Sequence, residues 1–169
     1  MNIVLIGYRG TGKSTVGKLI AARLGRVLVS TDEEIISRAK RTIPEIVAKE
    51  GWEYFRDLES DVCRDLAGRD QLIIDTGGGA ILRPKNVEAL KRNGTLCWLT
   101  ASVETIVKRI GRDNQRPSLT GTKSFVDEVQ DVLRERIPKY QAAADHVLAT
   151  DDRSSTELAE ALLALVPRS

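Results

Sequence analysis

Short apolar runs alternate with helical patterns along the whole chain. Five runs have the length and composition of strands: Ile3–Ile6, Val27–Val29, Leu72–Ile74, Thr95–Leu99 and His146–Ala149. The first run is apolar at every position, which is typical of a strand buried on both faces. Because helical patterns separate the runs, they are expected to form βαβ units. We therefore predict an α/β fold with a five-stranded parallel sheet and helices on both faces.

Helices are predicted where apolar residues recur at helical spacing between capping or breaking residues. The predicted segments are Ser14–Leu24, the stretch between Gly51 and Gly68, Pro84–Arg92, Ser102–Ile110 and Ser155–Leu165. Thr31 with Glu34, and Thr42 with Glu45, have the spacing of a capping box, so each pair is predicted to open a helix.

One segment departs from this alternation. Arg112–Ser124 reads RDNQRPSLTGTKS, with a proline, a glycine and a single aliphatic residue. A segment of this composition buries little surface, so we expect a mobile loop there. The chain shows no internal repeat and no linker, which indicates one domain over residues 1–169.

The composition narrows the class of protein. The 169 residues are 41% hydrophobic and 30% charged, as in one globular domain. A net charge of +2 provides no bulk basic field for nucleic acid, and the early apolar run is too short for a signal peptide or membrane span. Cys63 and Cys97 form no CxxC pair, so neither a disulfide nor structural zinc is expected. We expect a cytoplasmic protein that binds neither nucleic acid nor membrane.

The segment between the first strand and the first helix carries a phosphate-binding motif. Gly7-Tyr8-Arg9-Gly10-Thr11-Gly12-Lys13-Ser14 matches G-x-x-x-x-G-K-[ST]. The glycines allow backbone N–H groups to converge on phosphate oxygens, and the helix that follows adds its positive end. In this motif Lys13 reaches the β- and γ-phosphates and the Ser14 hydroxyl ligates Mg²⁺. The chain is predicted to bind a nucleoside triphosphate through Gly10, Thr11, Gly12, Lys13, Ser14 and Thr15.

The rest of the sequence favours a small-molecule kinase among P-loop proteins. A GTPase would carry an N-K-x-D guanine motif, and a nucleic-acid motor would show a basic face. The sequence has neither of these features. Asp32 follows the second strand, and Gly77-Gly78-Gly79 follows the third. In an open parallel sheet these carboxyl-end positions border one crevice, so we expect the acceptor to bind there.

At these residues the chain resembles the shikimate kinases, over essentially its whole length. The matching motifs are the P-loop, Asp32 after strand two, Phe55–Glu59 (F-R-x-x-E), Thr76–Gly79 (T-G-G-G), Arg116-Pro117 and Arg136–Tyr140 (R-x-P-x-Y). The resemblance implies a P-loop fold related to the nucleoside monophosphate kinases, with a lid at about 112–124. It also implies transfer of the γ-phosphoryl of ATP, with Mg²⁺, to the 3-hydroxyl of shikimate, on the route to the aromatic amino acids.

The resemblance further implies roles for individual residues. Asp32 is expected to hold the acceptor hydroxyls and take up the proton. Arg56 and Arg136 are expected to clamp the shikimate carboxylate, with the backbone of Gly77, Gly78 and Gly79 closing the pocket. Three arginines are implied on the ATP side. Arg116 is expected at the transferring phosphate, as a catalytic group beside Lys13. Arg109 and Arg153 are expected around the adenine.

Ser30 departs from the family pattern, which usually has an acidic residue two positions before the substrate aspartate. Asp75 ends the third strand, where other P-loop enzymes keep a carboxylate near the metal. We therefore hypothesise that Asp75 compensates in the outer shell of Mg²⁺. Lys139 replaces a leucine that is common before the motif's tyrosine, and this change bears on acceptor selectivity.

Simpler roles compete for several of these residues. A helix dipole alone favours Asp32 at a helix start. Arg56 on a solvated face would gain at most about 0.5 kcal/mol from Glu53 or Glu59, and Arg134 is an alternative to Arg136. Two other functions stay open: a kinase of another small polyol acid such as gluconate, and an ATP-binding regulatory module without turnover. A monomer is the default expectation for a kinase of this size.

Overall fold

Five parallel strands form one sheet, in the order β2-β3-β1-β4-β5, in the computed structural model, which describes residues 1–111 and 124–167. The strands are β1 (Asn2–Ile6), β2 (Val27–Ser30), β3 (Leu72–Asp75), β4 (Gly94–Thr100) and β5 (His146–Ala149). Helices occupy the crossovers between them, as parallel strands require. The predicted strands and their parallel pairing are confirmed.

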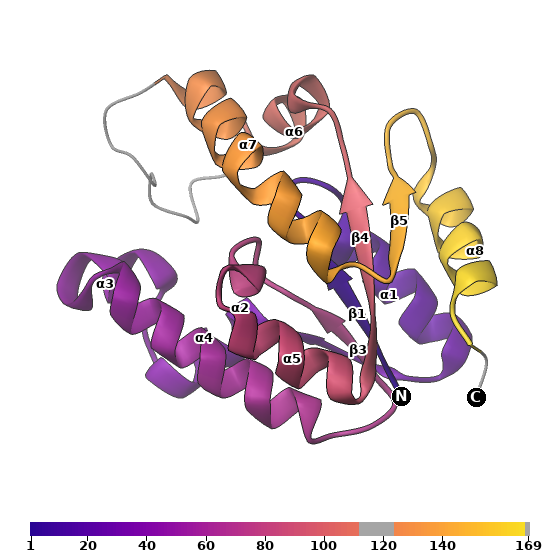
Figure 1. Cartoon of the computed structure of the whole chain (residues 1–169), viewed down its shortest axis with the longest axis horizontal. Coiled ribbons are helices and arrows are strands. Elements are labelled where there is room, and N and C mark those ends of the chain that lie inside the picture. Colours follow the sequence, from indigo (N-terminus) through magenta and orange to yellow (C-terminus); the bar gives the residue numbers. More distant parts are fainter. Residues whose placement is uncertain (112–123, 168–169) are drawn as a thin grey trace.

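Helices cover both faces of the sheet (Figure 1). One face packs against α1 (Lys13–Leu24) and α8 (Ser155–Leu165). The other face packs against α2 (Thr31–Ala39), α3 (Ile43–Glu50), α4 (Trp52–Ala67), the short 3-10 turn η1 (Ala80–Leu82), α5 (Pro84–Arg92) and α7 (Phe125–Ala143). Beyond the sheet, α6 (Val103–Ile110) packs against α7.

The central strand β1 divides the core between the two faces. Ile3 and Leu5 pack toward α1 and α8, whereas Val4 and Ile6 belong to the core under α4 and α5. This split follows from the alternation of side chains along a strand. Burial of each such side chain contributes about 1.5–3 kcal/mol. Because β1 is buried along its whole length, it fixes where the loop after Ile6 emerges.

Most predicted helix starts are confirmed, but the start of α2 is corrected. Ser30, not Thr31, is the N-cap, and its hydroxyl accepts a hydrogen bond from the Glu33 N–H at 3.3 Å. Thr31 is the first helical residue, and its Oγ1 accepts a hydrogen bond from the Gly77 N–H at 2.9 Å. The tertiary partner therefore decides the role of the threonine. Thr42 caps α3 as predicted.

The long helix α7 has no counterpart among the predicted elements. It contains Pro138, whose missing N–H and bulky ring disfavour a helix interior. Ser124 caps the helix, with its hydroxyl accepting from the Asp127 N–H at 3.3 Å. The helix buries Arg136 and Tyr140, one turn apart, and this packing holds it together despite the proline. Of the lid predicted at about 112–124, residues 112–123 lie outside the described residues, and Ser124 is the cap of α7.

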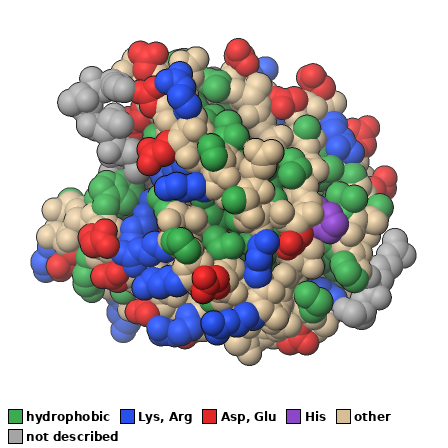
Figure 2. Space-filling view, viewed as in Figure 1, with side chains coloured by type: hydrophobic (Ala, Val, Ile, Leu, Met, Phe, Trp, Pro, Cys, Tyr) green, Lys and Arg blue, Asp and Glu red, His purple; other side chains and the backbone are tan. Residues whose placement is uncertain are grey.

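Charged side chains of both signs are interspersed over α4 and α5 (Figure 2). Arg83 caps α5 and donates to Glu53 and Asp57 of α4 at 2.6 and 2.7 Å. Exposed ion pairs of this kind contribute about 0–1 kcal/mol each. They join α5 to the helix that carries Arg56. Across residues 1–111 and 124–167, none of the helices has the length and apolar character needed to cross a membrane.

Candidate active site

A cleft of about 390 Å³ opens at the carboxyl edge of the sheet. Its walls come from the P-loop and from the segments that follow β2 and β3. The lining residues are Arg9, Gly10, Gly12, Lys13, Ser14, Ser30, Asp32, Ile36, Thr42, Ile43, Asp75, Thr76, Gly77 and Gly78. These segments meet because β2, β3 and β1 are neighbours whose carboxyl ends point the same way. The structure thus brings Lys13, Ser14, Asp32 and Asp75 together.

The P-loop curls around the ammonium group of Lys13. The Lys13 Nζ donates to the carbonyls of Gly7 at 2.8 Å and Tyr8 at 3.0 Å. Gly7 has a φ of 144°, and a Cβ there would lie 2.5 Å from the carbonyl oxygen of Leu99. Only glycine fits this position. Since the loop leads into the N-terminus of α1, the arrangement suits an anionic ligand.

Two of the predicted P-loop contacts to the nucleotide lie outside the cleft lining. The Thr11 hydroxyl is buried and donates to the Tyr8 carbonyl at 2.9 Å, so it fixes the shape of the loop. Thr15 is exposed in the first turn of α1.

Ser14 and Asp75 place two oxygen donors side by side. The Ser14 hydroxyl donates to the Asp75 Oδ2 at 2.6 Å. Burial raises the pKa of Asp75, while Lys13 and the Ser14 hydrogen bond favour the ionised form. Hydroxyl and carboxylate oxygens are the ligands that Mg²⁺ prefers, and Mg²⁺ usually keeps several waters. The pair therefore fits a site for Mg²⁺.

Asp32 lies half-buried at the second position of α2, where it lines the cleft. The helix N-terminus favours a carboxylate at this place, and Ser30 supplies the cap beside it. The place at the helix start and the place in the cleft are therefore compatible for Asp32. The helix start holds the carboxylate, and the sheet edge turns it toward the P-loop.

Arg56 is buried, so the alternative of a solvated Arg56 is wrong. Its Nη1 donates to Glu59 Oε1 at 2.8 Å, and Glu59 is 0% exposed. The guanidinium carbon lies 5.4 Å from the Trp52 ring centroid and 5.2 Å from that of Phe55. These contacts orient the guanidinium, which carries five N–H donors in a fixed geometry.

A second buried guanidinium comes from α7. Arg136 is 7% exposed, and its guanidinium carbon lies 5.8 Å from the centroid of the Tyr8 ring. The alternative residue Arg134 has an 80% exposed side chain and pairs with Asp131 at the surface. The prediction of Arg136 over Arg134 is therefore supported by burial.

The glycine turn lies against both guanidinium groups. A Cβ on Gly78 would be 3.3 Å from Arg136 Nη1, and a Cβ on Gly79 would be 2.4 Å from the terminal nitrogens of Arg56. The small residues allow this close approach. Two arginines near one point can grip a carboxylate with directional, charge-assisted hydrogen bonds.

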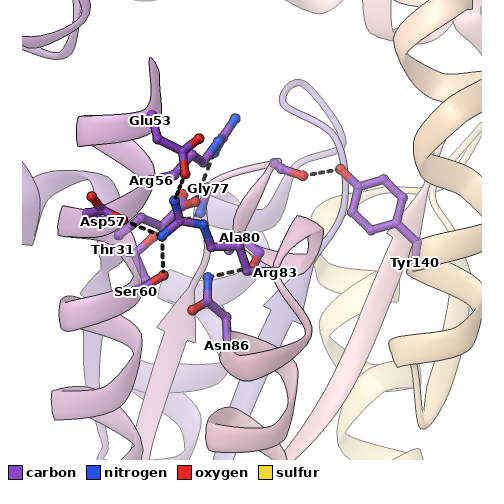
Figure 3. Close-up of polar contacts among 12 residues, drawn as sticks. Thr31, Glu53, Arg56, Asp57, Ser60, Gly77, Ala80, Arg83, Asn86 and Tyr140 are labelled. Carbon is purple, nitrogen blue, oxygen red and sulfur yellow. Dashed lines mark hydrogen bonds and ion pairs between the residues drawn. The ribbon is translucent and has the colours of Figure 1, made fainter. Parts of the chain in front are cut away.

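The sequence predicted Thr31 only as a helix cap and gave Tyr140 no role of its own, yet both hold the glycine turn. Figure 3 shows the Thr31 hydroxyl at the Gly77 N–H and the Tyr140 hydroxyl donating to a carbonyl on the opposite side, that of Gly78. The sequence signals for Tyr140 are its place at the end of the R-x-P-x-Y motif and its spacing four residues after Arg136, which places both on one face of a helix.

The predicted adenine contacts lie at the other side of the P-loop. Arg109 Nη1 donates to the Gly10 carbonyl at 3.1 Å and to Thr150 Oγ1 at 3.4 Å. Arg153 follows β5, is exposed, and donates to the Ala149 carbonyl at 3.5 Å. The structure places Arg109 at the P-loop backbone, whereas Arg116 lies outside the described residues.

The chain is similar to several known proteins. The solved gluconokinase from Sinorhizobium meliloti has a TM-score of 0.56 at 17% identity, covering 96% of this chain and 89% of that chain. At that identity the likeness shows a common fold alone.

Much stronger matches concern one family. The family model described as shikimate kinase matches residues 9–167. The shikimate kinase of Nitratidesulfovibrio vulgaris is 47% identical over 152 residues, which cover 88% of this chain and 86% of that protein. The solved shikimate kinase from Acinetobacter baumannii, in complex with shikimate, has a TM-score of 0.92 at 38% identity, covering 97% of this chain and 91% of that one. The chain therefore belongs to the shikimate kinase family, whose members phosphorylate shikimate with ATP.

Proposed function

We propose that this chain, as a shikimate kinase, transfers the γ-phosphoryl of Mg-ATP to the 3-hydroxyl of shikimate, giving shikimate 3-phosphate and ADP. The observation that carries the proposal is the pair of buried guanidinium groups, Arg56 and Arg136, at the Gly78–Gly79 turn beside the P-loop cleft. A carboxylate bound between them would direct the hydroxyls of the same small molecule toward Asp32.

The P-loop is proposed to bind the triphosphate of ATP. The backbone N–H groups of Gly10–Ser14 and the N-terminus of α1 would bind phosphate oxygens, with Lys13 between the β- and γ-phosphates. Arg109, already at the Gly10 carbonyl, and Arg153 would flank the adenine. Arg116 would neutralise the transferring phosphoryl group, and its loss would lower turnover by about 10³-fold or more.

Ser14 and Asp75 are proposed to hold Mg²⁺, the serine directly and the aspartate through a water. Magnesium neutralises charge on the β- and γ-phosphates in this class of reaction. Asp75 is the register partner of Ser30 on the neighbouring strand. A carboxylate at the end of β3 therefore lies one strand away from the position where the family usually has its acidic residue.

Asp32 is proposed to accept hydrogen bonds from the acceptor hydroxyls and to take up the proton of the reacting one. The acceptor oxygen forms the new bond to the γ-phosphorus as the bond to the ADP oxygen breaks. The freed proton passes to the carboxylate of Asp32. Positioning and charge neutralisation supply most of the rate in such reactions, so no covalent intermediate is needed.

A coupled ADP-release assay with Mg-ATP tests the proposal. Shikimate, quinate, gluconate and a blank without acceptor are compared at equal concentration. We expect turnover that depends strongly on shikimate. Turnover favouring gluconate would replace the acceptor assignment, and ATP binding without transfer to any acceptor would favour a regulatory module instead.

The chain is further proposed to act as a cytoplasmic monomer. Both cysteines, Cys63 and Cys97, are buried free thiols, which suits a reducing compartment. Sedimentation velocity at micromolar concentration measures the oligomeric state, and a dimer mass would refute the monomer.

A further inference from the structure

Successive residues of the segment Thr76–Gly78 are hydrogen-bonded to different elements of the fold. The Thr76 hydroxyl donates to the Leu5 carbonyl of β1 at 2.8 Å. The Gly77 N–H donates to Thr31 of α2 at 2.9 Å, and the Gly78 carbonyl accepts from the hydroxyl of Tyr140 in α7. Figure 3 shows the last two contacts on opposite sides of the turn.

The Tyr140 hydroxyl is held in a defined place. The residue is 1% exposed, and its ring stacks on Trp98 with centroids 5.6 Å apart and planes at 23°. Tyr140 lies four residues after Arg136, so both side chains project from one face of α7. Both meet Gly78, the tyrosine at the carbonyl and the arginine at the α-carbon.

The turn connects two helices that supply the two guanidinium groups. Arg56 comes from α4 and Arg136 from α7, and η1, which follows the turn directly, packs against both helices. Gly79 touches the guanidinium of Arg56, whereas its neighbour Gly78 is bonded to α7. Gly78 and Gly79 therefore connect the surroundings of the two guanidinium groups along the chain.

We propose that Tyr140 is a positioning residue for acceptor binding, because its hydroxyl holds Gly78 against α7 and thereby sets the spacing of Arg56 and Arg136. The proposal rests on the proposed function, in which these two arginines grip the carboxylate of shikimate. Paired charge-assisted hydrogen bonds are directional, so a small change in spacing weakens the grip. Tyr140 acts on the acceptor side and leaves the ATP side unchanged.

The variant Tyr140→Phe tests the proposal, since it keeps the ring and removes only the hydroxyl. Two acceptors are compared: shikimate, and its analogue with the carboxylate reduced to a hydroxymethyl group. For shikimate we expect kcat/KM to fall about tenfold, mostly through KM, as for loss of one buried hydrogen bond. For the analogue the fall stays within about twofold, as does the change in KM for ATP.

Leu163→Ala in α8, on the other face of the sheet, is the matched control for general loss of stability. It is expected to lower the midpoint of thermal unfolding without changing the ratio between the two acceptors. An equal fall for both acceptors in Tyr140→Phe, or no fall for shikimate, would overturn the proposal. If Tyr140→Phe does not fold, Trp98→Phe, which disturbs the stack and keeps the hydroxyl, must show the same preference for one acceptor in weaker form.

Amide hydrogen exchange separates this proposal from the assignment of the acceptor. The exchange of the amides of Gly78, Gly79 and Ala80 is expected to quicken in Tyr140→Phe, whichever acceptor the enzyme uses. Unchanged exchange there would refute the anchoring by Tyr140. Wild-type turnover without preference for shikimate would instead refute the proposed function.

Discussion

Arg56 and Glu59 form an ion pair of 2.8 Å in which the carboxylate has no exposure to solvent. A second pair on the same helix, Asp61 with Arg64, has the same three-residue spacing, but its side chains are 54% and 69% exposed. The two pairs project from different faces of α4, one buried and one exposed. Burial decides which of them orients a functional arginine.

Glu59→Gln is expected to lower the free energy of unfolding by about 3 kcal/mol, because it leaves a buried guanidinium without its counter-charge. Asp61→Asn, the matched control, is expected to change it by no more than about 0.5 kcal/mol. Urea denaturation followed by tryptophan fluorescence measures both. Equal losses in the two variants would contradict the role of burial.

The parts of the fold that were predictable are those with local signals. The strand Ile3–Ile6 shows in its unbroken apolar run, and the P-loop in its fixed residues. The contacts that build the acceptor side join distant residues: Thr31 meets Gly77 46 positions away, and Tyr140 meets Gly78 62 positions away. Such pairings depend on the folded sheet, so no local sequence pattern predicts them.

The burial of Arg56 is also not predictable from local sequence. Its spacing to Glu59 is visible in the sequence, but that spacing is equally typical of a solvated pair. Only the packing of α4 against the sheet places Arg56 inside. The helix α7 was missed because Pro138 is a strong local signal against a helix, and tertiary burial outweighs it.

Removing the carboxylate at position 75, and then placing one at position 30, tests the proposed metal site. Asp75→Asn is expected to raise the Mg²⁺ concentration needed for half-maximal activity about tenfold, a loss of the size given by outer-shell substitutions at metal sites. Ser30→Asp combined with Asp75→Asn is expected to recover most of this loss, because the two positions are register partners and aspartate also serves as an N-cap. Activity is titrated against free Mg²⁺ at saturating ATP. An unchanged Mg²⁺ dependence in Asp75→Asn would contradict the site.

The two thiols are expected to be unreactive in the folded protein. Burial raises the pKa of Cys63 to about 12, with Glu59 and Asp32 adding to the rise, and burial likewise raises the pKa of Cys97 to about 12. A thiol reagent at pH 8 is expected to label neither in the native protein and both in denaturant. Labelling of the native protein at the unfolded rate would contradict this burial.

The same shifts predict the alkaline stability of the protein. The thiols of the unfolded chain ionise at about pH 8.5, which is below the pKa of the same thiols in the folded protein. The buried neutral thiols therefore make their full contribution to the free energy of unfolding below that pH. This contribution is lost as the pH rises toward 12. Urea midpoints at pH 8 and pH 10 are compared for the wild type and for Cys63→Ala combined with Cys97→Ala. The wild type is expected to lose more stability between the two pH values than the variant, and an equal loss would refute the prediction.

Arg136→Lys separates charge from geometry on the acceptor side. Lysine keeps the positive charge but loses the planar fork that binds a carboxylate with two hydrogen bonds. We expect KM for shikimate to rise by about tenfold or more, in line with about 1.5–3 kcal/mol for a hydrogen bond to a charged group. KM for ATP should change little, because Arg136 lies at the glycine turn. Arg134→Lys, two residues away and exposed, is the control and is expected to match the wild type in steady-state kinetics. Equal effects of the two substitutions would show that α7 contributes only general positive charge, and that the buried guanidinium does not hold the carboxylate.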